Sequence, residues 1–492
     1  MDWPFRSVLV ANRGEIAVRI VRTVQRLGLR AVVVHHEIDA GSLAVARADE
    51  AIEIEGATPV AAYLDAAQIV AAAVTAGAGA VHPGYGFLSE NAAFARACAD
   101  AGLVFVGPAP DVIERMGNKI TARGIVAAGG FPVAPSAIES DDPSTFAARA
   151  GRIGFPLLLK PASGGGGKGM HVVREASLLP AATLRARSEG QRYFGDGSLY
   201  AERFVENPRH IEVQVLGDHH GNLVHLFERE CSVQRRFQKI VEETPSPALG
   251  AELRNDICAA AAGIARRAGY TNAGTVEFIQ GGGEFFFLEM NTRLQVEHPV
   301  TEELLGIDLV EQQLRIAAGE RLAFAQADLQ PRGHAFEFRI CAEDPARGYL
   351  PTTGRVLALQ EPSGAGVRVD SGIAAGQTVT AAFDPLLAKL VVSGETRIEA
   401  IARARQALHD YVLLGCKTNI GFLHRLTSHP AFVAGEIHTG FLDADPDVAG
   451  EPPLDEPSLN ALLAAAARAS RPLRDAADAV PSLHAAIGAW HN

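Results

Sequence analysis

The sequence lacks the cysteine patterns of a zinc site or a disulfide-stapled fold. Among 492 residues there are only five cysteines, Cys98, Cys231, Cys258, Cys341 and Cys416. They are scattered, odd in number and never spaced as Cys-x-x-Cys, whereas structural zinc sites and disulfide frameworks need closely spaced or paired cysteines. Both classes are therefore excluded, and the sequence favours the reducing cytoplasm as its location.

The sequence also lacks a surplus of positive charge and any long apolar run. With 57 acidic and 45 basic side chains its formal net charge is −12, which argues against nucleic acid as a partner because phosphate backbones are bound by basic faces. A single basic cleft for an anionic ligand is still compatible with this balance. The most apolar stretch, residues 66–81, is mostly Ala and Gly and contains Gln68, so we expect no membrane span. No basic segment leads into an apolar core at the start, so we expect no signal peptide.

What is present is typical of a globular protein. Apolar residues make up 48% and charged residues 21% of the chain, a balance that excludes disorder. The 49 glycines do not recur in a triplet period, which excludes a collagen-like repeat, and we find no other internal repeat. A chain of this length predicts two to four domains.

The first hundred residues alternate between strand-like and helix-like patterns. The predicted elements are a strand at Ser7–Ala11, a helix at Glu15–Leu27, a strand at Ala31–His35, a helix at Ala61–Ala76 and a strand at Leu103–Gly107. Alternation of this kind is typical of a parallel α/β sheet.

Later segments favour antiparallel pairing. Strand-like Phe155–Lys160 and His171–Val173 flank a glycine-rich tip, and Gly274–Gln280 and Glu284–Met290 are joined by three glycines. Residues 331–442 contain short strand patterns and then a helix pattern at Arg397–Tyr411. The tail, rich in Asp and Pro and then in Ala, is interpreted as a peripheral helical appendage or a linker.

The glycine-rich tip, Gly164–Gly169, has two interpretations. It is either a flexible turn or a flap whose backbone N–H groups approach phosphate oxygens without side-chain obstruction. It is not a Walker loop, because Lys168 is followed by Gly169 rather than Ser or Thr. A strand rather than a helix follows it, which excludes a dinucleotide fingerprint. Lys160, at the end of the preceding strand, would be a fixed cation beside the same phosphates.

Polar residues alternate along Glu289–Pro299. On an extended chain, alternate side chains share one face, which would place these residues together: Glu289, Asn291, Arg293, Gln295 and Glu297. Glu277 lies on the neighbouring strand pattern, and carboxylate and amide oxygens on adjacent strands suit Mg²⁺ that bridges nucleotide phosphates. The alternative is a solvent-facing edge strand with no special role.

Two further clusters stay open at this point. Glu228–Lys239 is either a salt-bridged surface loop or a basic wall for an anion, with Lys239 as the candidate. His82–Glu90, rich in glycine and aromatic residues, is either a structural turn or part of a site.

Together these stretches resemble the biotin carboxylase family, a branch of the ATP-grasp enzymes. The matching segments occur in the family's order at similar spacing: Val10–Ala17, His82–Asn91, Lys160–Met170, Glu206–His210, Gln234–Lys239 and Glu289–Thr301. The resemblance extends from about residue 4 to 445 and implies a mixed α/β and α+β fold. The implied parts are a Rossmann-like N-terminal domain (1–115), an ATP-grasp domain (116–330) with a mobile glycine-loop lid (132–204), and a C-terminal domain of antiparallel sheet and helices (331–445), followed by the helical tail (446–492).

The resemblance also implies an activity and its residues. The family carboxylates biotin with bicarbonate and MgATP, through carboxyphosphate, with Mn²⁺ as an alternative metal. Implied nucleotide contacts are Lys119, Lys160, Gly166, Gly167, Glu202, Val205, His210 and Gln234; implied metal ligands are Glu277, Glu289 and Asn291. Implied bicarbonate-pocket residues are Lys239, Arg293, Gln295 and Val296, with Glu297 as general base. Arg339 is similar to a residue that holds phosphate and biotin, and Tyr85 and Asp384 are similar to biotin-site residues.

Two positions depart from the family pattern. Phe237 stands where the family usually has histidine, which puts one polar nucleotide contact in doubt. The stretch Thr380–Pro385 lacks the family's usual aromatic pair before Asp384, so the biotin end is expected to have a different shape.

The biotin itself is expected on a separate carrier protein. A biotin-acceptor lysine is normally flanked by methionine, and none of Met1, Met116, Met170 and Met290 adjoins a lysine. The chain is therefore expected to be a biotin carboxylase subunit or one piece of a larger polypeptide. The resemblance implies a carboxyltransferase partner and a homodimer.

The final carboxyl acceptor stays open. Residues 481–490 resemble the region after the carboxylase part of acyl-CoA carboxylase α chains, which favours an acyl-CoA, whereas residues 241–247 are similar to urea carboxylases. A pyruvate carboxylase component is a further alternative. Rival functions are another ATP-grasp ligase, which would not need Lys239 and the Arg293–Glu297 stretch, and a non-catalytic nucleotide-binding regulatory subunit.

Overall fold

The computed structural model describes residues 3–139, 142, 144–161, 169–194, 197–450 and 456–469. The chain divides into two compact units, residues 1–449 and residues 450–492. No helix in the described ranges is both long and apolar enough to cross a membrane.

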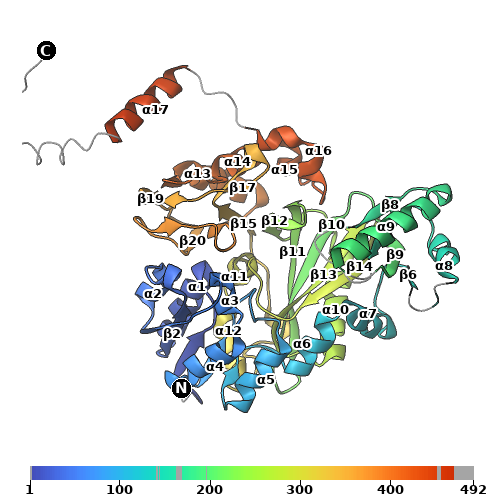
Figure 1. Cartoon of the computed structure of the whole chain (residues 1–492), viewed down its shortest axis with the longest axis horizontal. Helices are drawn as coiled ribbons and strands as arrows, with labels where there is room; N and C mark the ends of the chain where they lie inside the picture. Colours follow the sequence, from blue (N-terminus) through green and yellow to red (C-terminus); the bar gives the residue numbers. More distant parts are fainter. Residues whose placement is uncertain are drawn as a thin grey trace, which may run out of the picture. The chain divides into compact units, whose positions relative to one another are not determined.

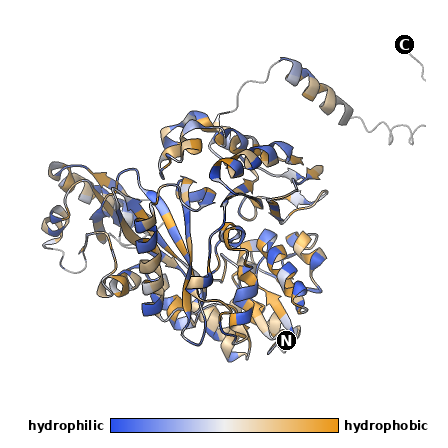
Figure 2. Cartoon of the chain, turned by 180° about the vertical axis from the view of Figure 1, so that it is seen from behind, coloured by the Kyte–Doolittle hydropathy of each residue, from blue (hydrophilic) through white to orange (hydrophobic). Residues whose placement is uncertain are grey.

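A five-stranded parallel sheet forms the N-terminal part, in the order β3-β2-β1-β4-β5. Its strands are β1 (Ser7–Val10), β2 (Arg30–His35), β3 (Glu50–Glu53), β4 (Ala80–His82) and β5 (Val104–Phe105). The predicted parallel α/β sheet is confirmed. The hydropathy colouring of Figure 2 shows hydrophobic residues along this sheet near the N-terminus, which matches the full burial of Val8, Leu9 and Val10.

Helices α1 to α7 belong to this part and to the segment that follows it (Figure 1). They are α1 (Gly14–Arg26), α2 (Leu43–Arg47), α3 (Pro59–Tyr63), α4 (Ala66–Thr75), α5 (Ala92–Asp100), α6 (Pro110–Gly117) and α7 (Lys119–Ala128). The single helix predicted at Ala61–Ala76 is wrong, because Asp65 starts a new helix by accepting a hydrogen bond from the Gln68 backbone N–H.

An eight-stranded antiparallel sheet runs through the middle and C-terminal parts of the chain, in the order β14-β13-β10-β11-β12-β15-β22-β20. Its strands are β10 (Arg209–Gly217), β11 (Leu223–Arg235), β12 (Gln238–Thr244), β13 (Asn272–Gly281), β14 (Glu284–Asn291), β15 (His334–Cys341), β20 (Val367–Ser371) and β22 (Leu386–Gly394). The hairpin predicted around Gly281–Gly283 is confirmed as the β13–β14 pair.

Helices pack against this sheet and extend its core. They include α10 (Ala251–Ala268), α11 (His298–Leu305), α12 (Leu309–Ala317), α13 (Arg397–Asp410), α14 (Ile420–Leu426), α15 (Pro430–Ala434) and α16 (Phe441–Ala444). Short strands complete the C-terminal part: β16 (Glu343–Asp344), β17 (Leu350–Pro351), β18 (Gly354–Arg355), β19 (Ala358–Gln360), β21 (Thr378–Val379) and β23 (Val412–Leu414). The helix predicted at Arg397–Tyr411 is confirmed to within one residue as α13.

A smaller antiparallel sheet, in the order β6-β9-β7-β8, bears the segment expected to form the lid. Its strands are β6 (Ser136–Ile138), β7 (Leu157–Pro161), β8 (His171–Val173) and β9 (Leu199–Arg203), accompanied by α8 (Phe146–Arg152) and α9 (Leu179–Phe194). The predicted pairing of the strands flanking the glycine-rich tip is confirmed, because Leu157–Leu159 pairs with His171–Val173. The tip itself, 162–168, lies outside the described residues.

The second unit contains helix α17 (Glu456–Ala469), in the segment expected to be a helical appendage or linker. Three of its leucines, Leu459, Leu462 and Leu463, are exposed.

Candidate active site

One cavity of about 1220 Å³ is lined by every predicted site residue that the structure describes. These residues are Tyr85, Lys119, Lys160, Glu202, Val205, His210, Gln234, Lys239, Glu277, Glu289, Asn291, Arg293, Gln295, Val296, Glu297, Arg339 and Asp384. Gly166 and Gly167 lie outside the described residues. Residues from the N-terminal, middle and C-terminal parts of the chain thus meet at one site.

Lys239 connects three acidic side chains in this cavity. Lys239 lies near the start of β12, just after the β11–β12 turn. Its Nζ donates to Glu212 Oε2 at 2.6 Å, Glu277 Oε1 at 2.9 Å and Glu297 Oε1 at 2.6 Å. Burial opposes the charge of Lys239, but the three carboxylates outweigh it and raise its pKa well above the ordinary value. The side chain is therefore a fixed cation.

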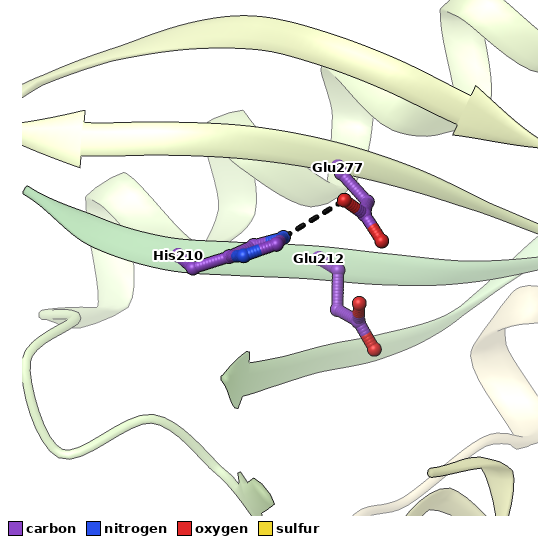
Figure 3. A group of neighbouring side chains, drawn as sticks. All are labelled: His210, Glu212 and Glu277. Carbon is purple, nitrogen blue, oxygen red and sulfur yellow. Dashed lines mark hydrogen bonds and ion pairs between the residues drawn. The ribbon is translucent and has the colours of Figure 1, made fainter. Parts of the chain in front are cut away.

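His210 and Glu277 form a second polar contact on neighbouring strands (Figure 3). The imidazole Nε2 lies 2.9 Å from Glu277 Oε2, and Glu212 is the cross-strand neighbour of Glu277. Burial raises the pKa of Glu277, but Lys239 and His210 outweigh it and hold that pKa well below the ordinary value. Three potential metal ligands thus gather here, and the Lys239 ammonium already supplies the cation that balances them.

A set of hard oxygen atoms follows along the β13–β14 pair. Glu277 and Glu289 are cross-strand partners, and Asn291 ends β14 and donates from Nδ2 to Glu277 Oε1 at 2.9 Å. The Glu289 carboxylate lies 3.2 Å from the Lys119 Nζ. Two carboxylates and an amide oxygen are the donor chemistry that Mg²⁺ prefers, so these residues fit a magnesium ion.

The strict strand alternation predicted for Glu289–Glu297 is wrong beyond Asn291. Strand β14 ends there, and the chain turns before α11 begins at His298. The carboxylate of Glu90 holds this turn, because it accepts from the Thr292 N–H at 3.1 Å and from Arg293 Nε at 2.9 Å. The alternative of a solvent-facing edge strand is half right: β14 is the edge strand of its sheet, but Gln295 and Glu297 follow it and are only 3% and 2% exposed.

Glu297 lies between two cations. Its Oε1 accepts from Lys239, and its Oε2 accepts from Arg339 Nη2 at 3.0 Å. Burial raises the pKa of Glu297, but Lys239 and Arg339 outweigh it and hold that pKa below the ordinary value. Arg339 also donates from Nε to Glu242 Oε1 at 2.7 Å, and burial raises the pKa of Glu242 to about 7.

The lid sheet contributes a cation to the same cavity. Lys160, on β7, donates from Nζ to Glu202 Oε1 on β9 at 2.7 Å, and the ammonium lies 4.8 Å from the centroid of the Tyr200 ring. Val205 and Lys119 line the same region of the chain's cavity. This wall combines positive charge with apolar and aromatic surface.

Phe237 occupies the tip of the β11–β12 hairpin. Arg236 and Phe237 both have left-handed backbone conformations, with φ of 46° and 67°, as a two-residue hairpin turn requires. The Phe237 side chain is 63% exposed and lines the cavity. An apolar ring therefore faces the space where the resemblance implies a polar histidine.

A buried chain of contacts connects three parts of the molecule beside the cavity. Tyr85 donates its hydroxyl to Glu15 on α1, and the Glu15 carboxylate lies 3.3 Å from Lys389 Nζ on β22. Lys389 also donates to the Val296 carbonyl at 2.8 Å. Tyr85 and Val296, two predicted site residues, are thereby held by the same buried pair. Asp384 precedes β22 and accepts from the Leu386 N–H at 3.0 Å.

Sequence reasoning missed several residues that contact the predicted ones, namely Glu15, Glu90, Glu212, Glu242 and Lys389. Glu15 and Glu90 could have been identified from the sequence, because both lie in segments that carry the family resemblance. The others occupy ordinary strand positions and give no local signal. The surface-loop interpretation of Glu228–Lys239 is wrong, because Glu228, Arg229 and Glu230 are at most 1% exposed in β11.

Three family models match the chain in sequence order. Residues 4–113 match the model described as biotin carboxylase, N-terminal domain, and residues 337–444 match the biotin carboxylase C-terminal domain. Residues 118–325 match the ATP binding domain of the carbamoyl-phosphate synthase L chain.

Individual relatives agree with these matches. A biotin carboxylase of Halalkalibacterium halodurans is 50% identical over 443 residues, which cover 89% of this chain and 97% of the relative. The mitochondrial methylcrotonoyl-CoA carboxylase subunit alpha of Oryza sativa is 48% identical over 441 residues, 89% of this chain and 60% of that subunit.

A solved structure shares the fold. It is the biotin carboxylase domain dimer of the Hydrogenobacter thermophilus 2-oxoglutarate carboxylase, in complex with MgADP, ADP and bicarbonate. It is 42% identical, has a TM-score of 0.86, and is matched over 92% of this chain and 100% of that one.

Proposed function

The chain belongs to the biotin carboxylase family, and from that premise we propose that its cavity carboxylates biotin on a separate carrier protein. Members of this family are ATP-dependent carboxylating ligases, and this chain is one of them. MgATP, bicarbonate and carrier-bound biotin are the reactants. The observation that carries the proposal for the site is the cavity itself, in which the Lys239 ammonium contacts Glu212, Glu277 and Glu297.

Bicarbonate is assigned to the pocket of Lys239, Gln295, Val296 and Arg293. Lys239 is held as a cation. Gln295 and Val296 belong to the turn that follows β14 and line the same cavity, and Gln295 donates to Glu277 Oε1, the oxygen that also accepts from Lys239. An anion bound here would compete with Glu297 for the positive charge of Lys239. This exchange supports Glu297 as the general base, because a carboxylate that loses a cationic partner regains basicity.

The nucleotide is assigned to the wall formed by Lys119, Lys160, Glu202, Val205, His210 and Gln234. Lys160 would neutralise charge on the phosphoryl group that transfers to bicarbonate, a role that fixed cations serve in phosphoryl transfer. Glu277, Glu289 and Asn291 would hold the magnesium ion of MgATP. When bound, that ion neutralises phosphate charge. In this step bicarbonate oxygen bonds to the γ-phosphorus and ADP leaves, which gives carboxyphosphate.

Biotin is assigned to the end of the cavity near Tyr85, Arg339 and Asp384. After carboxyphosphate yields CO₂ and phosphate, the phosphate removes the ureido proton and the nitrogen attacks CO₂. Arg293 would stabilise the resulting enolate-like oxygen, since a guanidinium keeps its proton and presents planar donors. Its present ion pair with Glu90 would be exchanged for that oxygen.

The assembly around the chain is proposed from its relatives and its composition. Homologues of the family work with a carrier protein and a carboxyltransferase. We propose a homodimer, supported by the dimer of the Hydrogenobacter relative, and a cytoplasmic location, supported by five unpaired thiols.

We propose an acyl-CoA as the final acceptor, supported by the identity to the Oryza sativa subunit. A urea or pyruvate carboxylase component is the alternative, distinguished by supplying each acceptor to the reconstituted system and counting fixed labelled carbonate.

The central test is phosphate release from ATP by the purified chain with Mg²⁺, with and without bicarbonate and free biotin. We expect release that requires bicarbonate and rises with biotin. Glu297→Gln should lower this rate by about 10²–10⁴-fold, the range for loss of a general base. ATP binding without bicarbonate-dependent turnover would contradict the proposal and favour a regulatory subunit.

A further inference from the structure

Arg229 contacts the Gln295 side chain of the proposed bicarbonate pocket and is fully buried, with 0% of its surface exposed. It belongs to β11, and every N–H of its guanidinium is matched by a side-chain acceptor. The acceptors are Glu212 Oε1, Gln214 Oε1 at 2.8 Å, Thr301 Oγ1 at 3.0 Å, Thr275 Oγ1 at 3.2 Å and Gln295 Oε1 at 2.7 Å. A buried charge needs such matching to be tolerated, so the guanidinium has one orientation.

This orientation determines which way the Gln295 amide faces. A guanidinium only donates, so the Gln295 atom at 2.7 Å from Arg229 Nη2 is the carbonyl oxygen. The amide nitrogen then lies on the opposite side, where it donates to Glu277 Oε1 at 2.7 Å. Gln295 therefore presents N–H groups, not its oxygen, toward the pocket side.

The same guanidinium also fixes Glu212. Arg229 Nε donates to Glu212 Oε1, while the other oxygen, Oε2, accepts from Lys239 at 2.6 Å. The carboxylate plane is thus held between two cations, and it in turn holds the Lys239 ammonium in the cavity. Two of the pocket donors, Lys239 and Gln295, are oriented by contacts that lead back to Arg229.

We propose that Arg229 is a positioning residue for the bicarbonate pocket: it orients the Gln295 amide as a donor and holds the Glu212 carboxylate against the Lys239 ammonium. By this arrangement Lys239 and Gln295 both present donors to the ligand, which favours an anion with acceptor oxygens. The inference rests on the proposed function, because it takes the pocket of Lys239 and Gln295 as the bicarbonate site.

The test is Arg229→Lys, which keeps the positive charge but loses the fork that reaches Gln295 and Glu212 together. We expect the KM for bicarbonate to rise by about tenfold or more while the KM for ATP changes by less than about twofold. The matched control is Arg19→Lys. Arg19, on α1, is 2% exposed and pairs with Glu302 and Asp308 away from the cavity, so this variant loses comparable buried contacts and keeps the bicarbonate KM of the parent.

A double-mutant cycle distinguishes a role of Arg229 in positioning Gln295 from a general loss of packing around the pocket. If Arg229 acts partly through Gln295, Arg229→Lys should raise the bicarbonate KM by a smaller factor when Gln295→Ala is already present than it does in the parent. Full additivity of the two changes would overturn this route.

Thr301→Val provides a second variant if Arg229→Lys fails to fold. It removes one hydroxyl that holds the guanidinium and keeps the shape of the side chain, so we expect about a threefold rise in the bicarbonate KM. An unchanged bicarbonate KM in both variants, with a parent enzyme that needs bicarbonate, would overturn the positioning role alone. A parent whose ATP turnover ignores bicarbonate would overturn the proposed function and this inference with it.

Discussion

Single residues determine the polarity of the cavity wall, and Phe237 is an example. Its exposed ring stands at the tip of the β11–β12 hairpin with φ of 67°. Histidine tolerates this left-handed conformation better than a bulky apolar residue. The position therefore accepts a polar side chain without rebuilding the turn.

Phe237→His should lower the KM for ATP. A new hydrogen bond contributes about 0.5–1.5 kcal/mol, which corresponds to about a two- to tenfold change. Initial-rate measurements across ATP concentrations check this, with Phe237→Leu as the control that changes the ring but adds no donor. Equal KM values for the two variants would show that the nucleotide does not contact this position.

Element ends carry much of the molecule's polar bonding, and the start of α12 is an example. Asp308 accepts from the Glu311 N–H as the helix cap and pairs with Arg19 and Arg26. Burial raises the pKa of Asp308, but Arg19 outweighs it, so the pKa falls from 3.8 to about 2.

Asp308→Asn should therefore alter stability in acid. Because the folded-state pKa is depressed, the carboxylate's contribution is fully present above about pH 4 and is lost as the pH falls toward 2. At pH 7 the variant should lose about 2 kcal/mol of unfolding free energy, and this deficit should shrink below pH 4. Urea unfolding at several pH values measures it. The control is Asp111→Asn, which removes an exposed ion pair with Arg115 and should change the free energy of unfolding little. A deficit for Asp308→Asn that stays constant with pH would contradict an ionic origin of the stabilisation.

Close packing between elements is tested at Gly372, which follows β20. A Cβ there would lie 2.5 Å from the Glu15 backbone nitrogen and 2.8 Å from the Gly14 carbonyl carbon at the start of α1. Gly372→Ala should destabilise the protein by about 1–3 kcal/mol, since backbone atoms cannot move aside easily. Gly421→Ala, within α14 and with no atom nearer than 3.6 Å, should instead stabilise by about 0.5–1 kcal/mol. Unfolding midpoints that shift in the same direction for both would refute the packing argument.

At the scale of the whole molecule, the cavity belongs to the first of the two units. Within the part of the chain that the structure describes, the residues that line the cavity all fall within residues 1–449, and residues 450–492 form their own unit. A chain ending at Ala449 should keep its bicarbonate-dependent ATP turnover within about twofold of the full chain. A loss of turnover in a truncated chain with unchanged thermal unfolding would assign the second unit a role in catalysis.

Local pattern was enough for the sequence to predict much of the fold. The parallel N-terminal sheet, the β13–β14 hairpin and helix α13 followed from short-range spacing of apolar residues and glycines. The break at Asp65 was missed, because an N-cap inside an alanine-rich stretch barely changes the apolar pattern. The roles of the individual site residues stay predictions.

The sequence by itself determined the family and identified a set of residues that line one cavity, because those residues lie in local motifs. Only the tertiary structure decided how they contact one another. Lys239 meets Glu212, Glu277 and Glu297 across three strands and a turn. Arg229 on β11 reaches Gln295 in the turn between β14 and α11. Such contacts depend on the register of the strands and on burial, which removes water as an alternative partner for a charge. Neither can be recognised from the local order of residues.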